Sequence, residues 1–180
     1  MTVLANVFGI AAVIVFVLSY QFKAKSSIII CNALSRVLYV TQYFLLGAFE
    51  GAWLDITAFV VSLLCLAQAK SKSQKSLPIL IVSSNLLVVG VGMLSYKNLF
   101  SLLPILGVIF ETQALYLKSV KTVLWMSLLG APFWLVYNFL NDAYGSLIGN
   151  VITIISITIA LIRQYRKKKA SILCETEDMV

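Results

Sequence analysis

Three charged side chains interrupt stretches that are otherwise apolar, and they are the first candidates for chemistry. Arg36, Asp55 and Glu111 each lie inside such a stretch. A charge at the centre of a membrane span costs roughly 2.5–3.5 kcal/mol on insertion scales, so each one needs a function or a partner. Arg36 and Glu111 fall at similar depths, roughly 10 to 14 Å from the cytoplasmic ends of their stretches at ~1.5 Å per residue. We therefore expect them to meet, directly or across water, between two parts of the chain. A buried ion pair that only fixes helix packing is the alternative.

The other candidates are polar or aromatic. Asp55 lies about four residues below the outer end of its stretch, or ~6 Å at ~1.5 Å per residue, which predicts a solvated residue near the start of a span. A proton site is the alternative. Trp134 and Tyr137 could stack on a ligand or pack at the membrane interface. Five amides at depth could line a cavity or bridge helices, and bridging is favoured for each of them: Asn32, Gln42, Asn85, Gln113 and Asn138.

Several kinds of chemistry are excluded or disfavoured by the residue types. The chain has no histidine, which excludes a catalytic triad or dyad that uses one. Its cysteines, Cys31, Cys65 and Cys174, form no C-x-x-C pair, so no zinc-type ligand set can be assembled by spacing. No G-x-S-x-G elbow and no ATP-binding motif occurs. We expect no enzymatic activity, no catalytic residue, no metal and no cofactor.

The elements that carry these residues read as membrane helices. Of the 180 residues 61% are hydrophobic and only 12% are charged, with a mean hydropathy of +0.97. A soluble domain of this size requires a more polar surface. The apolar residues run continuously, in stretches close to the ~20 residues that cross a bilayer. We predict an all-α membrane protein with seven transmembrane helices, near residues 3–20, 27–47, 51–69, 77–96, 99–117, 122–140 and 143–162.

The loop charges predict the orientation. The formal net charge is +7. The basic residues lie after the first, third and fifth stretches and in the tail: Lys23, Lys25, Lys70, Lys72, Lys75, Lys118, Lys121, Arg163, Arg166, Lys167, Lys168 and Lys169. The opposite side carries only Glu50, Lys97 and Asp142. This bias predicts an N-terminus outside and a C-terminus in the cytoplasm, and it fits topology better than binding of nucleic acid.

A weak internal repeat divides the chain. The first three stretches align with the last three at an offset of about 95 residues, so that Tyr39 matches Trp134. After one loop deletion Gly51 matches Gly145, which puts Asp55 and Asn150 one residue apart in register. Three spans invert the chain, so a fourth must restore its direction before the second half. We predict two parallel three-helix bundles (3+1+3), at 1–70 and 97–165, with a linker helix at 77–96 and a disordered cytoplasmic tail at 166–180.

The second half carries a family resemblance. Its features are the sequence LLPILG at 102–107, the W-x-x-x-N of Trp134 to Asn138, the small-residue turn around Gly145, and Asn150 ahead of a basic exit at Arg163. With these features the chain resembles the YgjV family of bacterial inner-membrane proteins. We associate that family with the PQ-loop and SWEET-like superfamily. The resemblance implies triple-helix bundles, often with transport of small solutes, and polar residues on the third helix of each half lining a pocket.

The leading functional prediction is a small-solute transporter or facilitator in the bacterial inner (plasma) membrane, with a central pocket between the halves. The alternative is a non-transporting receptor, scaffold or assembly protein, whose deep polar groups would all be mutually paired. The predicted partners are the lipid bilayer and an unknown solute, with a homo-oligomer left open. The candidate substrate-binding residues are Arg36, Asp55, Glu111, Trp134, Asn138 and Asn150.

Overall fold

The structure, a computed structural model, describes residues 2–19, 25–70, 77–117 and 119–177. Within these ranges the side chains of 19, 25, 26, 28, 29, 69, 70, 120 and 167–177 are not described. Four of the lysines that indicated the orientation lie outside the described residues: Lys23, Lys72, Lys75 and Lys118.

Seven α-helices and one 3₁₀ turn make up the described chain. The helices are α1 (Thr2–Ser19), α2 (Lys25–Leu46), α3 (Phe49–Lys70), α4 (Leu77–Leu94), α5 (Leu102–Tyr116), α6 (Val120–Leu140) and α7 (Tyr144–Glu177), with the turn η1 (Leu99–Ser101) ahead of α5. The predicted all-α class and the seven helices are confirmed. The backbone of α7 continues to Glu177, where we predicted a disordered tail from residue 166. Arg, Lys and Ala follow the apolar stretch directly and are good helix formers, so nothing stops the helix there.

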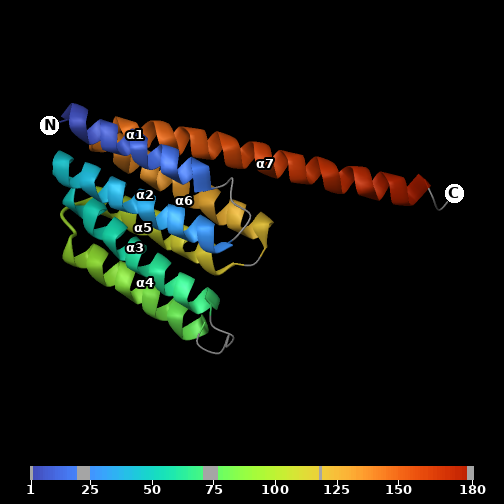
Figure 1. The fold of residues 1–180 in the computed structure, drawn as a ribbon, viewed down its shortest axis with the longest axis horizontal. Coiled ribbons are helices and arrows are strands. Elements are labelled where there is room, and N and C mark those ends of the chain that lie inside the picture. The colour runs from blue at the N-terminus through green and yellow to red at the C-terminus, as the bar shows by residue number, and fades with distance from the viewer. Residues whose placement is uncertain (1, 20–24, 71–76, 118, 178–180) are drawn as a thin grey trace.

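The helices lie side by side, and successive helices along the chain run in opposite directions (Figure 1). Neighbours in the chain pack together in both halves, as α1 on α2 on α3 and as α5 on α6 on α7. The halves meet where α1 packs on α7 and where α3 packs on α5. These contacts close a ring of six helices. Helix α4 packs on the outside of the ring, against α3 and α5.

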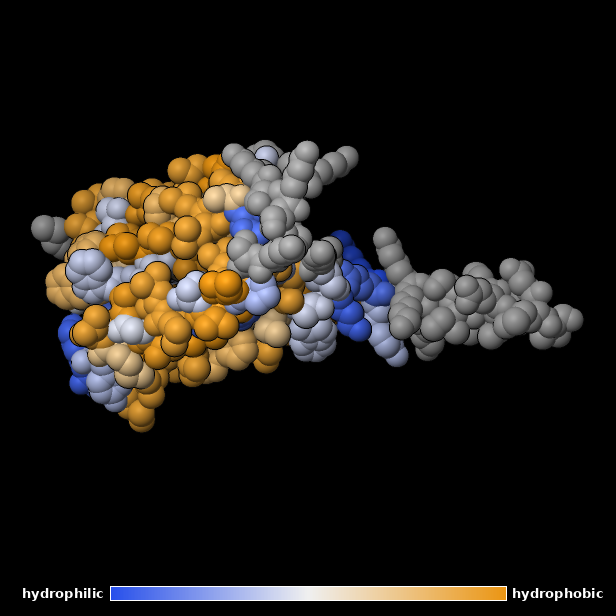
Figure 2. Space-filling view, turned by 90° about the horizontal axis from the view of Figure 1, so that it is seen from below, coloured by the Kyte–Doolittle hydropathy of each residue, from blue (hydrophilic) through white to orange (hydrophobic). Residues whose placement is uncertain are grey.

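The surface of the bundle is mostly apolar. Figure 2 shows hydrophobic residues over most of the face in view and hydrophilic residues where α7 leaves the bundle. Five helical segments in the described ranges are long and apolar enough to cross a membrane: Phe49–Gln68, Leu77–Leu94, Leu99–Tyr116, Lys121–Leu140 and Tyr144–Arg166. Thr2–Leu18 is a shorter apolar helix.

Two tight turns of the same kind connect α2 to α3 and α6 to α7. In the first, Gly47 has a φ of 72°, and the amide of Ala48 donates to the carbonyl of Tyr43 at 3.0 Å. In the second, Asp142 has a φ of 54°, and the amide of Ala143 donates to the carbonyl of Asn138 at 2.9 Å. Both are Schellman-type helix ends, which require a residue in the left-handed region.

The turns also bear on the register that we used to align the two halves of the sequence. Gly47 and Asp142 are 95 positions apart, and so are the first residues of α3 and α7, Phe49 and Tyr144. The loop deletion that we predicted between the halves is therefore wrong for this turn. Asp55 and Asn150 occupy the same position at this spacing, rather than positions one residue apart. Both turns need the same number of residues because they use the same hydrogen bonds.

Candidate functional site

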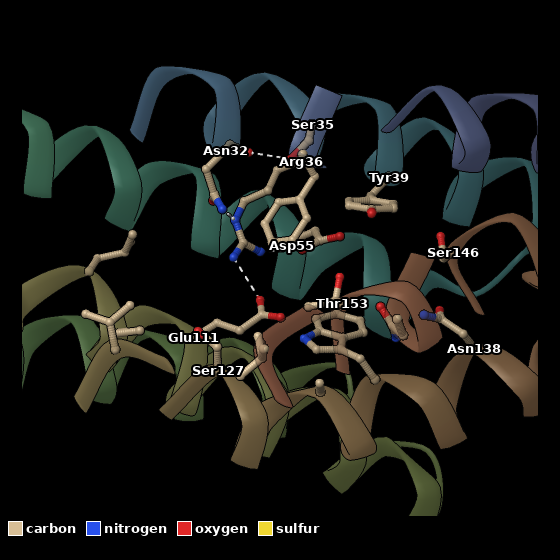
Figure 3. A pocket seen from close by; sticks show the side chains of 18 of the residues that line it. Asn32, Ser35, Arg36, Tyr39, Asp55, Glu111, Ser127, Asn138, Ser146 and Thr153 are labelled. Atoms are coloured by element: carbon tan, nitrogen blue, oxygen red, sulfur yellow. Dashed lines mark hydrogen bonds and ion pairs between the residues drawn. The ribbon is translucent and has the colours of Figure 1, made fainter. Parts of the chain in front are cut away.

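An ionic triad centred on Arg36 joins three helices. Near the middle of α2, Arg36 donates from Nη1 to Oδ1 of Asp55 on α3 at 2.7 Å. Its Nη2 donates to Oε2 of Glu111 on α5 at 2.9 Å, and its Nε donates to Oδ1 of Asn32 one turn earlier at 3.2 Å. Figure 3 shows the guanidinium directed at both carboxylates. A planar guanidinium suits this task because its donors point in fixed, divergent directions.

The triad confirms one prediction and overturns another. Arg36 and Glu111 meet directly, as their similar depths predicted. Asp55 is not the solvated residue that we predicted, because its exposed fraction is only 2%. The distance along α3 gives the depth of Asp55. Its burial depends on the helices that pack against α3, which are α2, α4 and α5. A buried carboxylate at this place requires the cation that Arg36 provides.

A cavity of about 150 Å³ lies inside the ring beside the triad. Every helix except α4 contributes to its wall. Since one water occupies about 10–15 Å³ on this measure, the cavity has room for roughly ten waters or a small solute. All six candidate residues from the sequence line it: Arg36, Asp55, Glu111, Trp134, Asn138 and Asn150. The structure thus brings together residues that span more than half of the chain.

Many residues on the cavity wall are 95 positions apart in the sequence. Twelve lining residues form six pairs with a spacing of 95 positions. The pairs are Phe16 with Glu111, Asn32 with Ser127, Arg36 with Ala131, Tyr39 with Trp134, Tyr43 with Asn138, and Asp55 with Asn150. The pair Tyr43 and Asn138 is in direct contact, since the tyrosine hydroxyl donates to Oδ1 of the amide at 2.7 Å.

Sequence reasoning missed several lining residues, notably Tyr43, Ser127 and Thr153. The first two could have been found by applying the spacing of 95 to the candidates Asn138 and Asn32. Thr153 carries no such signal. Its neighbours in α7 are apolar, and a threonine inside an apolar helix usually hydrogen-bonds to its own backbone.

Aromatic side chains form one part of the wall. The rings of Tyr43 and Trp134 are stacked, with centroids 5.9 Å apart and an interplanar angle of 13°. Tyr137 meets both rings edge-on at the same centroid distance. A Cβ on Gly107 of α5 would lie 2.7 Å from Nε1 of Trp134, so the indole needs a glycine there. Trp134 therefore packs within the protein and also faces the cavity.

Neutral hydrogen bonds tie the halves together beyond Tyr43, toward the end of the bundle that holds the two tight turns. The amide of Gly51 donates to the hydroxyl of Tyr137 at 2.8 Å. Ser146 on α7 donates to Oε1 of Gln42, whose Nε2 donates to Oδ1 of Asn6 on α1 at 3.4 Å. These contacts join α1, α2 and α7. They hold together the turn-bearing end of the bundle.

Most of the other deep amides bridge helices, as predicted. Gln113 on α5 donates to Asn85 on α4 at 2.7 Å, while Asn32 supports Arg36 within α2.

Two buried donors on the cavity wall, Nδ2 of Asn150 and Nε1 of Trp134, have no hydrogen-bond partner in the described part of the chain. No group of three or more His, Cys, Asp and Glu that could hold a metal occurs in the described ranges.

The comparison with known families decides what kind of protein this is. The family model Imp-YgjV, described as a bacterial inner membrane protein, matches residues 3–168. The chain belongs to the Imp-YgjV family. The match begins in α1 and ends in α7, so membership in the family applies to the whole bundle. No curated protein and no solved structure matches the chain.

Membership in the Imp-YgjV family places the apolar helices in the bacterial inner membrane. Lipid then covers the apolar side chains on the outside of the bundle. Arg36 and Asp55 of the triad are buried inside the bundle, with exposed fractions of 5% and 2%. Charges at such depth are rare in membrane proteins and face the interior, where they pair with one another. The triad of this Imp-YgjV protein follows that rule.

The hydrogen bond between Tyr43 and Asn138 leads to a first prediction. Replacing Tyr43 by phenylalanine is expected to lower the free energy of unfolding by about 1 kcal/mol, because Oδ1 of Asn138 loses its donor inside the bundle. Unfolding of the purified protein in detergent measures this. The control is Tyr165→Phe, on a residue that is 72% exposed, where no loss is expected. An equal loss from Tyr43→Phe in an Asn138→Ala background would contradict the pairing.

Proposed function

We propose that the chain is a small-solute transporter or facilitator whose solute binds in the central cavity. The observation that carries this proposal is the cavity itself. It lies between the two halves, inside a membrane-embedded ring, and six of the seven helices supply its charged, polar and aromatic wall. Polar groups gathered at membrane depth around a space large enough for a small molecule are typical of a solute path. The same reasoning favours transport over an enzymatic role.

The contacts between helices support the two-bundle architecture in this proposal. If α1, α2 and α3 correspond to α5, α6 and α7, then the contact of α3 with α5 corresponds to a contact of α7 with α1. Both contacts occur in the structure. The matching turns at Gly47 and Asp142 and the paired cavity residues agree with the same exchange. We infer two parallel three-helix repeats of the SWEET-like kind, with the N-terminus outside and the C-terminus in the cytoplasm.

The alternative is a non-transporting receptor or scaffold, in which the deep polar groups would all pair with one another. Many of them do pair, including Asn85 with Gln113. The two buried donors of Asn150 and Trp134 and the space beside the triad favour a solute instead.

Release of solutes from liposomes tests the proposal. Vesicles that hold the purified protein are loaded with a mixture of small metabolites, and the solutes that leave are identified by mass spectrometry. We expect at least one solute to leave several times faster than from protein-free vesicles. Glu111→Gln is expected to slow that release because it changes the charge of the cavity wall.

The matched control is Glu50→Gln, the same chemical change at the start of α3. Glu50 pairs with Lys97 at 3.4 Å and does not line the cavity. Vesicles with the Glu50→Gln protein should therefore release solute as fast as vesicles with the unaltered protein. Identical release from vesicles with and without folded protein, for every solute, would contradict transport.

A further inference from the structure

The charges on the cavity wall do not balance. Among the residues that line the cavity, the charged ones are Arg36, Asp55 and Glu111. One guanidinium therefore faces two carboxylates, and with all three ionised the wall carries one surplus negative charge. In a site largely shielded from bulk water such a surplus is costly until a cation or a proton compensates it.

No other residue on the cavity wall compensates the surplus. At the spacing of 95 positions, Arg36 is matched by Ala131, Asp55 by Asn150 and Glu111 by Phe16. None of these equivalents is charged, so the surplus belongs to α2, α3 and α5, which carry the three charged residues. With all three groups ionised, a ligand in the cavity lies next to a net negative charge.

Glu111 is the carboxylate that a ligand can reach. Its side chain is 30% exposed, whereas the side chains of Arg36 and Asp55 are 6% and 3% exposed. Arg36 already donates to both carboxylates and to Asn32, and only 6% of its side chain is exposed. An anionic ligand would therefore meet a carboxylate before it met a free guanidinium.

The aromatic part of the wall suits a cation as well. Tyr39, Tyr43 and Trp134 line the same cavity as Glu111. Aromatic faces attract ammonium groups through the ring quadrupole, most strongly where the site is dry, and they do so for alkylated ammonium groups that hydrogen-bond poorly. A cavity of about 150 Å³ fits a molecule of such a size.

We propose that the cavity binds a small organic cation, whose positive charge lies against Glu111 and the aromatic side chains. This inference rests on the proposed function, since it names the class of solute for the same cavity. The surplus charge is compensated when the cation is bound, which links occupancy of the cavity to the stability of the bundle.

The test is a thermal-shift titration of the purified full-length protein in detergent. The probes are choline chloride and tetramethylammonium chloride. The comparison ligands are 3,3-dimethyl-1-butanol, which is the neutral isostere of choline, and sodium acetate, which controls for ionic strength and offers an anion. We expect a saturable rise of Tm with a cation, no rise with the neutral isostere or with acetate, and an apparent affinity at least about tenfold weaker in Glu111→Gln.

Two further variants keep the test decisive. Glu111→Asp retains the charge and should retain the cation-dependent shift, which separates charge from a general effect of altering the residue. Glu50→Gln should bind as the unaltered protein does, because Glu50 lies outside the cavity. An equal shift with the neutral isostere, an unchanged affinity in Glu111→Gln, or no shift with either cation overturns the inference.

Failure here is distinguishable from failure of the proposed function. If the liposome experiment releases a neutral or anionic solute while neither cation shifts Tm, transport stands and the cationic class is wrong. If no solute of any charge is released, the transport proposal itself is wrong.

Discussion

Replacing Arg36 by alanine is expected to lower the free energy of unfolding by about 3–5 kcal/mol. The substitution leaves the carboxylates of Asp55 and Glu111 near each other without the cation that binds both of them. Removing one partner of a buried ion pair is costly because the remaining charge has lost its water and gains nothing in return. With two carboxylates stranded, the loss should lie at the upper end of this range. Unfolding of the purified protein in mixed detergent micelles measures it.

Two comparisons separate the charge effect from the loss of a large side chain. The triple variant Arg36→Met, Asp55→Asn, Glu111→Gln removes all three charges and should recover most of the stability. Lys97→Ala breaks a single ion pair with Glu50, in which the lysine side chain is 56% exposed and the glutamate side chain 12%, and should cost about 1 kcal/mol. If Arg36→Ala and Lys97→Ala cost the same, the triad does not stabilise the bundle.

Replacing Gly145 by alanine is expected to loosen the contact between α1 and α7 and to lower the free energy of unfolding by about 1–3 kcal/mol. A Cβ at this position would lie 2.6 Å from the carbonyl oxygen of Asn6 and 3.0 Å from the amide nitrogen of Ile10. These are backbone atoms of α1, which cannot rotate away as a side chain can. The helices must separate, and the hydrogen bond from the Gly145 amide to Oδ1 of Asn6 at 2.9 Å is then lost.

The matched control is Gly90→Ala in α4, where no atom lies within 4 Å of the added Cβ. Alanine suits a helix better than glycine, so this variant should be neutral or slightly more stable. Unfolding in detergent compares the two substitutions directly. A Gly145→Ala protein as stable as Gly90→Ala would mean that α1 and α7 are not packed closely at this point.

The helices were largely predictable from the sequence because each is encoded by its own apolar stretch. Their ends are encoded locally too, as Gly47 and the turn before Tyr144 illustrate. The path of α7 beyond the membrane was not predictable from hydropathy, which falls at Arg163 although the helix continues. Hydropathy reports where a helix leaves the lipid, whereas helix propensity determines where it ends.

Only the part of the site that follows from the depth of a residue along its own helix was predictable from the sequence. Arg36 and Glu111 have charges of opposite sign at one depth, and their pairing followed from that. Asp55 could not be placed in this way, since its burial depends on which helices flank α3. The aromatic side chain of Tyr43 carries no charge that would attract attention in an apolar stretch. Its importance becomes visible only through Asn138, 95 positions later.

The unequal distribution of charge between matching positions has a consequence for how the halves assemble. Two copies of the first half would present two arginines and two aspartates, but Phe16 at both glutamate positions. Two copies of the second half would present two glutamates and no arginine among the matching positions. Only unlike halves complete the triad. Because both halves belong to one polypeptide, Arg36 and Asp55 of the first half always meet Glu111 of the second half.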